Sequence, residues 1–147
     1  MYVKELTVRY RQRRVTGMLS LPGRLTNPRD AAAVLVPILR DEVIEVCGLL
    51  CLSTQTDILA YYELSRGTLD STIVHPRDVF RIALLANAAT VVVGHNHPSG
   101  DPTPSPDDRV LTQRLKDAGT LIGIPLTDHV IVVMDGRYFS FREAGRL

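Results

Sequence analysis

Short apolar runs and longer amphipathic stretches alternate along this 147-residue chain. Runs rich in β-branched residues indicate strands, and stretches that begin at a capping residue indicate helices. The pattern predicts strands over residues 3–10, 43–52, 58–64, 90–93, 124–134 and 138–141, and helices over 28–39, 76–87 and 106–118. Because helices and strands alternate, we expect an α/β or α+β fold with a mixed β-sheet flanked by helices.

Each predicted helix begins with a residue that can cap it and a proline in the first turn, at Asn27-Pro28, His75-Pro76 and Ser105-Pro106. Asp30 and Asp108 stand three residues after Asn27 and Ser105, the spacing of a capping box. His75 is therefore interpreted as an N-cap or surface residue. Gly119 is expected to lie just past the end of the last helix.

Length and composition favour one globular domain. The chain is 45% hydrophobic, yet no stretch approaches the roughly 20 apolar residues of a membrane span, and the first residues lack the apolar core of a secretory signal. Cys47 and Cys51 lie too far apart along one strand, about 13 Å, to form a disulfide. We expect a soluble, reduced, cytoplasmic protein with both cysteines in its core and no membrane contact.

The net charge of +1 conceals an asymmetry between the two parts of the chain. Residues 1–41 carry eight basic and three acidic side chains, whereas residues 42–147 carry nine basic and thirteen acidic ones. The basic N-terminal segment, with its cluster Arg11, Arg13 and Arg14, has two interpretations: contact with nucleic acid or another acidic partner, or a solvated strand and loop. We favour the second because only Arg11, Arg13 and Arg14 form a tight cluster and no ladder of aromatic residues accompanies them.

The chemistry of the chain concentrates between Val91 and Asp108. His95 and His97 are two residues apart at a predicted strand end, so both imidazoles face one side and Asn96 faces the other. Asp108, beyond a proline-rich loop, would complete a His2Asp zinc site with an open fourth position. A simple capping box explains Ser105 and Asp108 without metal; the two interpretations are compatible.

These residues resemble a known family. His95-x-His97-x7-Ser105-x2-Asp108 matches the signature of the JAMM (MPN+/JAB) metalloproteases, and the wording His-Asn-His-Pro-Ser-Gly-Asp-Pro resembles its RadC-like branch. Other features that resemble this branch are Gly67-Thr68-Leu69-Asp70, His75-Pro76-Arg77, Asp128-His129-x-Ile131 and Ser140-Phe141. The resemblance implies a three-layer JAB1/MPN-like (cytidine-deaminase-like) domain over residues 26–147, with residues 1–25 as a basic N-terminal strand or extension.

The signature also requires a glutamate on a neighbouring strand. Glu45, followed by an apolar stretch that includes Gly-Leu-Leu, stands where the family pattern places it. An acid at the start of a buried strand is costly unless it is paired or used. Glu42 is interpreted as a solvated residue at a helix end and Glu63 as a surface strand residue, so we favour Glu45.

The resemblance implies a zinc hydrolase acting on a peptide or isopeptide bond. His95, His97 and Asp108 would hold Zn²⁺, which lowers the pKa of its bound water to about 7. Glu45 would take and return the proton, and Ser105 would donate to the developing oxyanion. Because the RadC family carries a DNA-repair label, an accessory or nuclease-like module in DNA metabolism is the alternative.

Two questions stay open at this stage. Asp128 and His129 are either a pair that orients a metal ligand or structural residues of a strand, and we slightly favour the structural interpretation for His129. The sequence leaves the physiological substrate and the oligomeric state undetermined.

Overall fold

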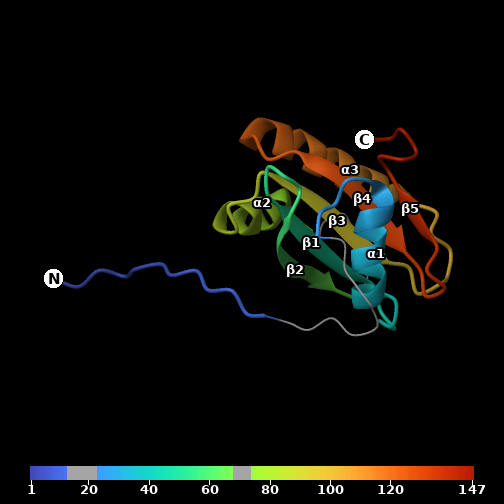
Figure 1. Cartoon of the computed structure of the whole chain (residues 1–147), viewed down its shortest axis with the longest axis horizontal. Helices are drawn as coiled ribbons and strands as arrows, with labels where there is room; N and C mark the ends of the chain where they lie inside the picture. Colours follow the sequence, from blue (N-terminus) through green and yellow to red (C-terminus); the bar gives the residue numbers. More distant parts are fainter. Residues whose placement is uncertain (13–22, 68–73) are drawn as a thin grey trace.

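The computed structural model describes residues 1–12, 23–67 and 74–147, and these residues form one five-stranded sheet and three helices (Figure 1). In chain order the elements are α1 (Pro28–Leu39), β1 (Val46–Leu52), β2 (Ile58–Arg66), α2 (Pro76–Leu85), β3 (Thr90–Asn96), α3 (Pro106–Ile122), β4 (Leu126–Val132) and β5 (Tyr138–Ser140). The interior elements agree with those predicted, and their ends differ by a few residues.

The sheet is mixed, with strand order β2-β1-β3-β4-β5. β1 runs antiparallel to both β2 and β3, β3 runs parallel to β4, and β5 returns antiparallel to β4. The crossover between the parallel strands is α3, so the central strand β3 leads directly into the loop and helix that complete the site. The predicted α/β class with a mixed sheet flanked by helices is confirmed.

The helices cover the two faces of the sheet in three layers (Figure 1). On one face α1 packs its buried residues against Val46, Leu50, Val92 and Val130. On the other face α2 and α3 bury a cluster that includes Cys47, Leu49 and Val93. Neighbouring residues of β1 and β3 thus enter different clusters, as expected for central strands covered on both sides. Both cysteines are free and buried, as predicted.

All three helix starts have the predicted capping residues. Asn27 and Ser105 form reciprocal capping boxes with Asp30 and Asp108, and Nδ1 of His75 accepts a hydrogen bond from the backbone N–H of Arg77. These interactions are local, so the spacing of residues along the chain is enough to predict them.

The end of α3 differs from the prediction. The helix continues through Gly119 to Ile122, and Gly123 ends it in the left-handed conformation at φ 82°. Gly119 serves a packing purpose instead, since a Cβ at this position would lie 2.6 Å from the carbonyl oxygen of Ile124. The glycine lets the helix approach the chain that enters β4.

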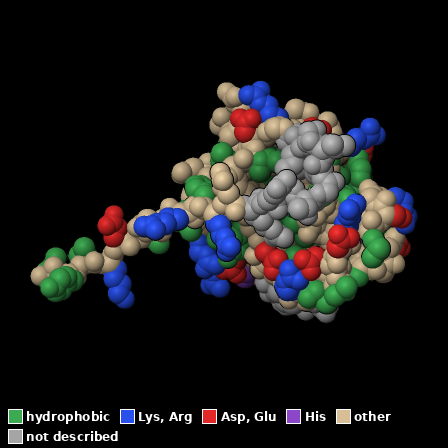
Figure 2. Space-filling model, turned by 60° about the horizontal axis from the view of Figure 1, so that its bottom comes forward, with side chains coloured by type: hydrophobic (Ala, Val, Ile, Leu, Met, Phe, Trp, Pro, Cys, Tyr) green, Lys and Arg blue, Asp and Glu red, His purple; other side chains and the backbone are tan. Residues whose placement is uncertain are grey.

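The strand expected over residues 3–10 is absent. Residues 1–12 have neither helix nor strand and are exposed, and they extend away from the rest of the molecule (Figures 1 and 2). Alternating apolar and polar residues make a strand only when a neighbouring strand accepts their backbone hydrogen bonds, and the described pairings offer none to this segment. Arg13 and Arg14, and Thr68, Leu69 and Asp70 of the RadC-like feature, lie outside the described residues. Within the described part of the chain, no helix is both long enough and apolar enough to pass through a membrane.

Candidate metal centre

The end of β3 and the start of α3 bring His95, His97 and Asp108 together. His95 is fully buried, Asp108 is 2% exposed, and the side chain of His97 is 11% exposed. Asn96, between the two histidines, points to the opposite face as predicted. Its Oδ1 accepts from the Val46 N–H at 2.7 Å and its Nδ2 donates to the Ile44 carbonyl at 2.9 Å. The amide thereby ties the end of β3 to the start of β1.

The three side chains bring their donor atoms together, with a different oxygen of Asp108 nearest to each imidazole. Nε2 of His95 lies 3.0 Å from Nε2 of His97 and 3.1 Å from Oδ1 of Asp108, and Nε2 of His97 lies 3.4 Å from Oδ2 of Asp108. Ligands bound at about 2.0–2.1 Å in a tetrahedron are separated by about 3.3 Å. A set of two imidazoles and one carboxylate at this spacing therefore fits a single cation.

The capping box of α3 aims the carboxylate. The backbone N–H of Ser105 donates to Oδ2 of Asp108 at 2.7 Å, and the N–H of Asp108 donates to Oγ of Ser105 at 3.1 Å. The serine hydroxyl acts as an acceptor in this box, which leaves its hydrogen for donation elsewhere. Asp108 therefore caps α3 together with Ser105, and the same hydrogen bonds orient its carboxylate as a proposed metal ligand.

Electrostatics favour a cation at this point. Burial opposes the charge of Asp108, but its contacts with the His95 and His97 rings and with the Ser105 N–H outweigh it and hold the pKa of Asp108 below its usual range. Burial likewise opposes a charge on His97, whose pKa is nevertheless raised by the Asp108 carboxylate, by the Asp101 carbonyl and by Glu45. The site therefore presents an ionised carboxylate and attracts positive charge.

A backbone contact determines which nitrogen His97 presents to the cluster. Its Nδ1 lies 2.7 Å from the carbonyl oxygen of Asp101, which can only accept, so Nδ1 carries the hydrogen and Nε2 carries the lone pair. The Asp101 side chain in turn accepts from the Thr103 N–H at 2.9 Å, which stabilises the loop.

Glu45 immediately precedes β1, the strand that pairs with the strand of the histidines. Cys47 pairs with His95 across the antiparallel β1 and β3, so extending the register by two residues places Glu45 across from His97. Glu45 is half-buried, and its charge raises the pKa of both His97 and Cys47. These observations show that its charge acts on His97 and on Cys47.

The two competing glutamates share Arg66 as a partner. Arg66 donates to Glu42 at 2.6 and 3.0 Å and to Glu63 at 2.9 Å. Glu63 is on the exposed side of β2, as expected. Glu42 is partly exposed, and both of its carboxylate oxygens accept hydrogen bonds from Arg66 of β2, a contact that no local pattern reveals.

Comparison with known proteins identifies the family. A family model for the RadC-like JAB domain matches residues 25–146. The chain belongs to the RadC-like JAB domain family. UPF0758 proteins are its relatives: that of Thermotoga maritima is 54% identical over 103 residues, 70% of this chain and 46% of that protein. That of Methanosarcina acetivorans is 42% identical over 134 residues, 90% of this chain and 58% of that protein. The chain spans about half the length of these curated relatives.

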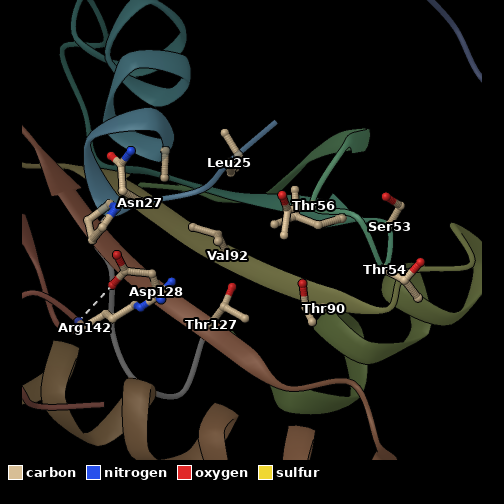
Figure 3. A pocket seen from close by; sticks show the side chains of 13 residues that line it. Leu25, Asn27, Ser53, Thr54, Thr56, Thr90, Val92, Thr127, Asp128 and Arg142 are labelled. Atoms are coloured by element: carbon tan, nitrogen blue, oxygen red, sulfur yellow. Dashed lines mark hydrogen bonds between the residues drawn. The ribbon is translucent and has the colours of Figure 1, made fainter. Parts of the chain in front are cut away.

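Asp128 and His129 have separate tasks in this RadC-like JAB domain. Asp128 faces a pocket on the α1 side of the sheet, beside Asn27, Thr127 and Arg142 (Figure 3). Its carboxylate accepts from the Ser140 hydroxyl at 2.6 Å and from the Arg142 N–H at 3.1 Å, so it ties β4 to the chain after β5. Burial raises the pKa of Asp128 despite these hydrogen bonds.

His129 faces the other side of β4, toward the cluster. Its ring stacks on Phe141 with centroids 5.0 Å apart and planes 10° from parallel, and its Nε2 lies 2.9 Å from Nδ1 of His95. Burial lowers the pKa of His129 well below its usual value. The suggested pairing of Asp128 with His129 as an orienting unit is wrong, because adjacent strand residues project to opposite faces. The sequence interpretation missed the contact between His129 and His95.

Thr112 is a second residue near the cluster that the sequence interpretation did not identify. It is 3% exposed, stands one turn after Asp108 on α3, and its Oγ1 lies 2.6 Å from Nδ1 of His129. The available signal was the spacing of four residues, which places Asp108 and Thr112 on the same face of a helix.

Proposed function

We propose that this RadC-like JAB domain is a zinc-dependent hydrolase of the JAMM type that cleaves a peptide or isopeptide bond. The observation that supports the proposal is the cluster of His95, His97 and Asp108 at the end of a buried strand, in which the closest donor atoms of each pair of residues lie 3.0 to 3.4 Å apart. Two imidazoles and one carboxylate are donors of the kind that zinc accepts in catalytic sites.

Two further residues of the chain would take part in the reaction beside the metal ligands. Bound zinc would supply Lewis-acid polarisation and a water of lowered pKa. Glu45, which immediately precedes β1 and whose charge acts on His97, would accept the proton of the attacking water and pass it to the leaving amine. The Ser105 hydroxyl would donate to the oxygen of the scissile carbonyl, where a single donor can contribute about 3 kcal/mol.

The first experiment measures metal content and turnover together. Protein purified without a histidine tag should contain about one zinc per chain, and Asp108→Ala should lose it. Glu45→Gln should keep the zinc and lose hydrolysis of a fluorescence-quenched peptide library, whereas the matched control Glu63→Gln should keep both. Zinc content that Asp108→Ala leaves unchanged, or turnover that survives Glu45→Gln, would contradict the proposal.

Nucleic-acid binding is a second candidate because the basic residues Lys4, Arg9 and Arg11 of the N-terminal segment are all exposed. Phosphate contacts would give a DNA affinity that falls with salt. Replacing Arg11, Arg13 and Arg14 with glutamine should then weaken binding to a 30-base-pair duplex and flatten its salt dependence. Unchanged binding would exclude a role for this segment.

A further inference from the structure

A buried series of hydrogen bonds leads from the imidazole of His95 back to the backbone of Asp108. Nδ1 of His95 lies 2.9 Å from Nε2 of His129, and Nδ1 of His129 lies 2.6 Å from Oγ1 of Thr112. The Thr112 hydroxyl donates to the carbonyl oxygen of Asp108 at 2.6 Å. His95 and His129 are fully buried and Thr112 is 3% exposed, so these groups satisfy one another within the protein.

The direction of every hydrogen in this series follows from its last member. A carbonyl oxygen only accepts, so the single hydrogen of the Thr112 hydroxyl points to Asp108 and its oxygen can only accept from His129. His129 therefore carries its hydrogen on Nδ1 and a lone pair on Nε2. That lone pair requires a hydrogen on Nδ1 of His95, which leaves Nε2 of His95 as the atom with a lone pair.

We infer that Thr112 and His129 are positioning residues, which hold His95 in the one neutral tautomer that can bind a metal through Nε2. The same nitrogen is the one that faces His97 and Asp108. The inference rests on the proposed function, because the tautomer matters to the chemistry only if His95 is a ligand. The stacking of His129 on Phe141 fixes the orientation of the His129 ring.

The series also links two of the proposed ligands. It starts at the side chain of His95 and ends at the backbone of Asp108, whose own carboxylate faces His95 at 3.1 Å. A displacement of α3 would therefore disturb the ring of His95 as well as the carboxylate. His97 is held differently, by a loop carbonyl, so a defect in the series should act on His95 and leave the tautomer of His97 unchanged.

Nitrogen NMR of the metal-free full chain tests the tautomers directly. The chain has four histidines, so single substitutions assign their ring signals. We expect His129 to be protonated at Nδ1 and unprotonated at Nε2, and His95 to carry a hydrogen on Nδ1. A hydrogen on Nε2 of His129 in the wild-type protein would overturn the inference.

Substitutions of Thr112 test the consequence for metal binding. Thr112→Val removes the hydroxyl at nearly constant shape and should weaken zinc affinity by about 10- to 100-fold, whereas Thr112→Ser should restore it. Thr120→Val is the matched control, because Thr120 on the same helix also donates to the carbonyl four residues earlier. Equal zinc affinity in Thr112→Val and Thr120→Val would overturn the inference.

The two measurements separate this inference from the proposed function. If the wild-type protein binds no zinc, the proposed hydrolase is wrong, while the ring signals of the metal-free protein still decide the tautomers. If Thr112→Val does not fold, the wild-type spectrum and the rescue by Thr112→Ser remain decisive.

Discussion

Two aspartates of this protein are equally buried and have opposite electrostatic environments. Asp108 and Asp128 are each 2% exposed, yet the pKa of Asp108 is lowered and that of Asp128 is raised. Burial opposes ionisation at both. Two imidazoles face Asp108, whereas Asp128 has a serine hydroxyl and backbone N–H groups. The partners therefore decide whether a buried carboxylate is held charged for a cation or serves to join two strands.

The largest expected effect is on metal binding. Asp108→Asn should weaken zinc affinity by more than about 100-fold, because losing a ligand exceeds the effect of losing an outer partner. Asp128→Asn, on the opposite face of β4, should leave the affinity within a few-fold of wild type. Competition with a chromophoric chelator measures both. Similar losses in the two variants would show that the aspartates do not differ in the way we describe.

For the stability of the fold, in contrast to metal binding, we expect Asp128 to matter strongly. Asp128→Ala leaves the Ser140 hydroxyl and the N–H groups of His129 and Arg142 without their acceptor, which should lower the free energy of unfolding by about 3 kcal/mol. Urea unfolding of the metal-free protein measures the change. Asp117→Ala, an exposed aspartate on α3, is the control and should cost less than about 0.5 kcal/mol. If Asp128→Ala lowered the free energy of unfolding no more than Asp117→Ala does, Asp128 would not stabilise the contact between β4 and the end of the chain.

The pH dependence of stability should distinguish the two sites. The lowered pKa of Asp108 gives stability that is present above about pH 3.8 and is lost as the pH falls further. The raised pKa of Asp128 gives a contribution present below about pH 3.8 and lost as the pH rises through its folded value. The raised pKa of His97 adds stability below about pH 6.5 that disappears above it.

Unfolding of the metal-free wild type, Asp108→Asn and Asp128→Asn from pH 3 to 8 measures these contributions. The deficit of Asp108→Asn should be largest between about pH 4 and 6.5, where Asp108 is ionised and His97 is protonated. The deficit of Asp128→Asn should be largest in acid. Parallel curves for the two variants would contradict the comparison.

The smallest effects concern the serine beside each aspartate. Ser105→Ala and Ser140→Ala each remove one hydrogen bond to the aspartate residue, at a cost of about 1 kcal/mol in unfolding free energy. Only Ser105→Ala should also lower zinc affinity, by up to about tenfold, because only Ser105 aims a ligand. Calorimetric zinc titration of the two variants checks this, and a loss in Ser140→Ala would argue against separate tasks.

Much of the site was predictable from residues close together in the chain. The spacing of His95 and His97 predicted a shared face, and Ser105 with Asp108 predicted the capping box that aims the carboxylate. The choice of Glu45 came from a family resemblance, and its catalytic role stays a prediction. The partner of Glu42 was not predictable, because Arg66 reaches it from β2, 24 residues away.

By itself the sequence determined the helix starts, the free buried cysteines and the pair of histidines facing one side of a strand, since these depend on hydrogen bonds and side-chain directions set within a few residues. Only the tertiary structure decided that His129 supports His95, that Asp128 turns away, and that residues 3–10 form no strand. These outcomes depend on the register of neighbouring strands and on partners far along the chain. The free energy of such contacts exists only once the whole sheet has assembled.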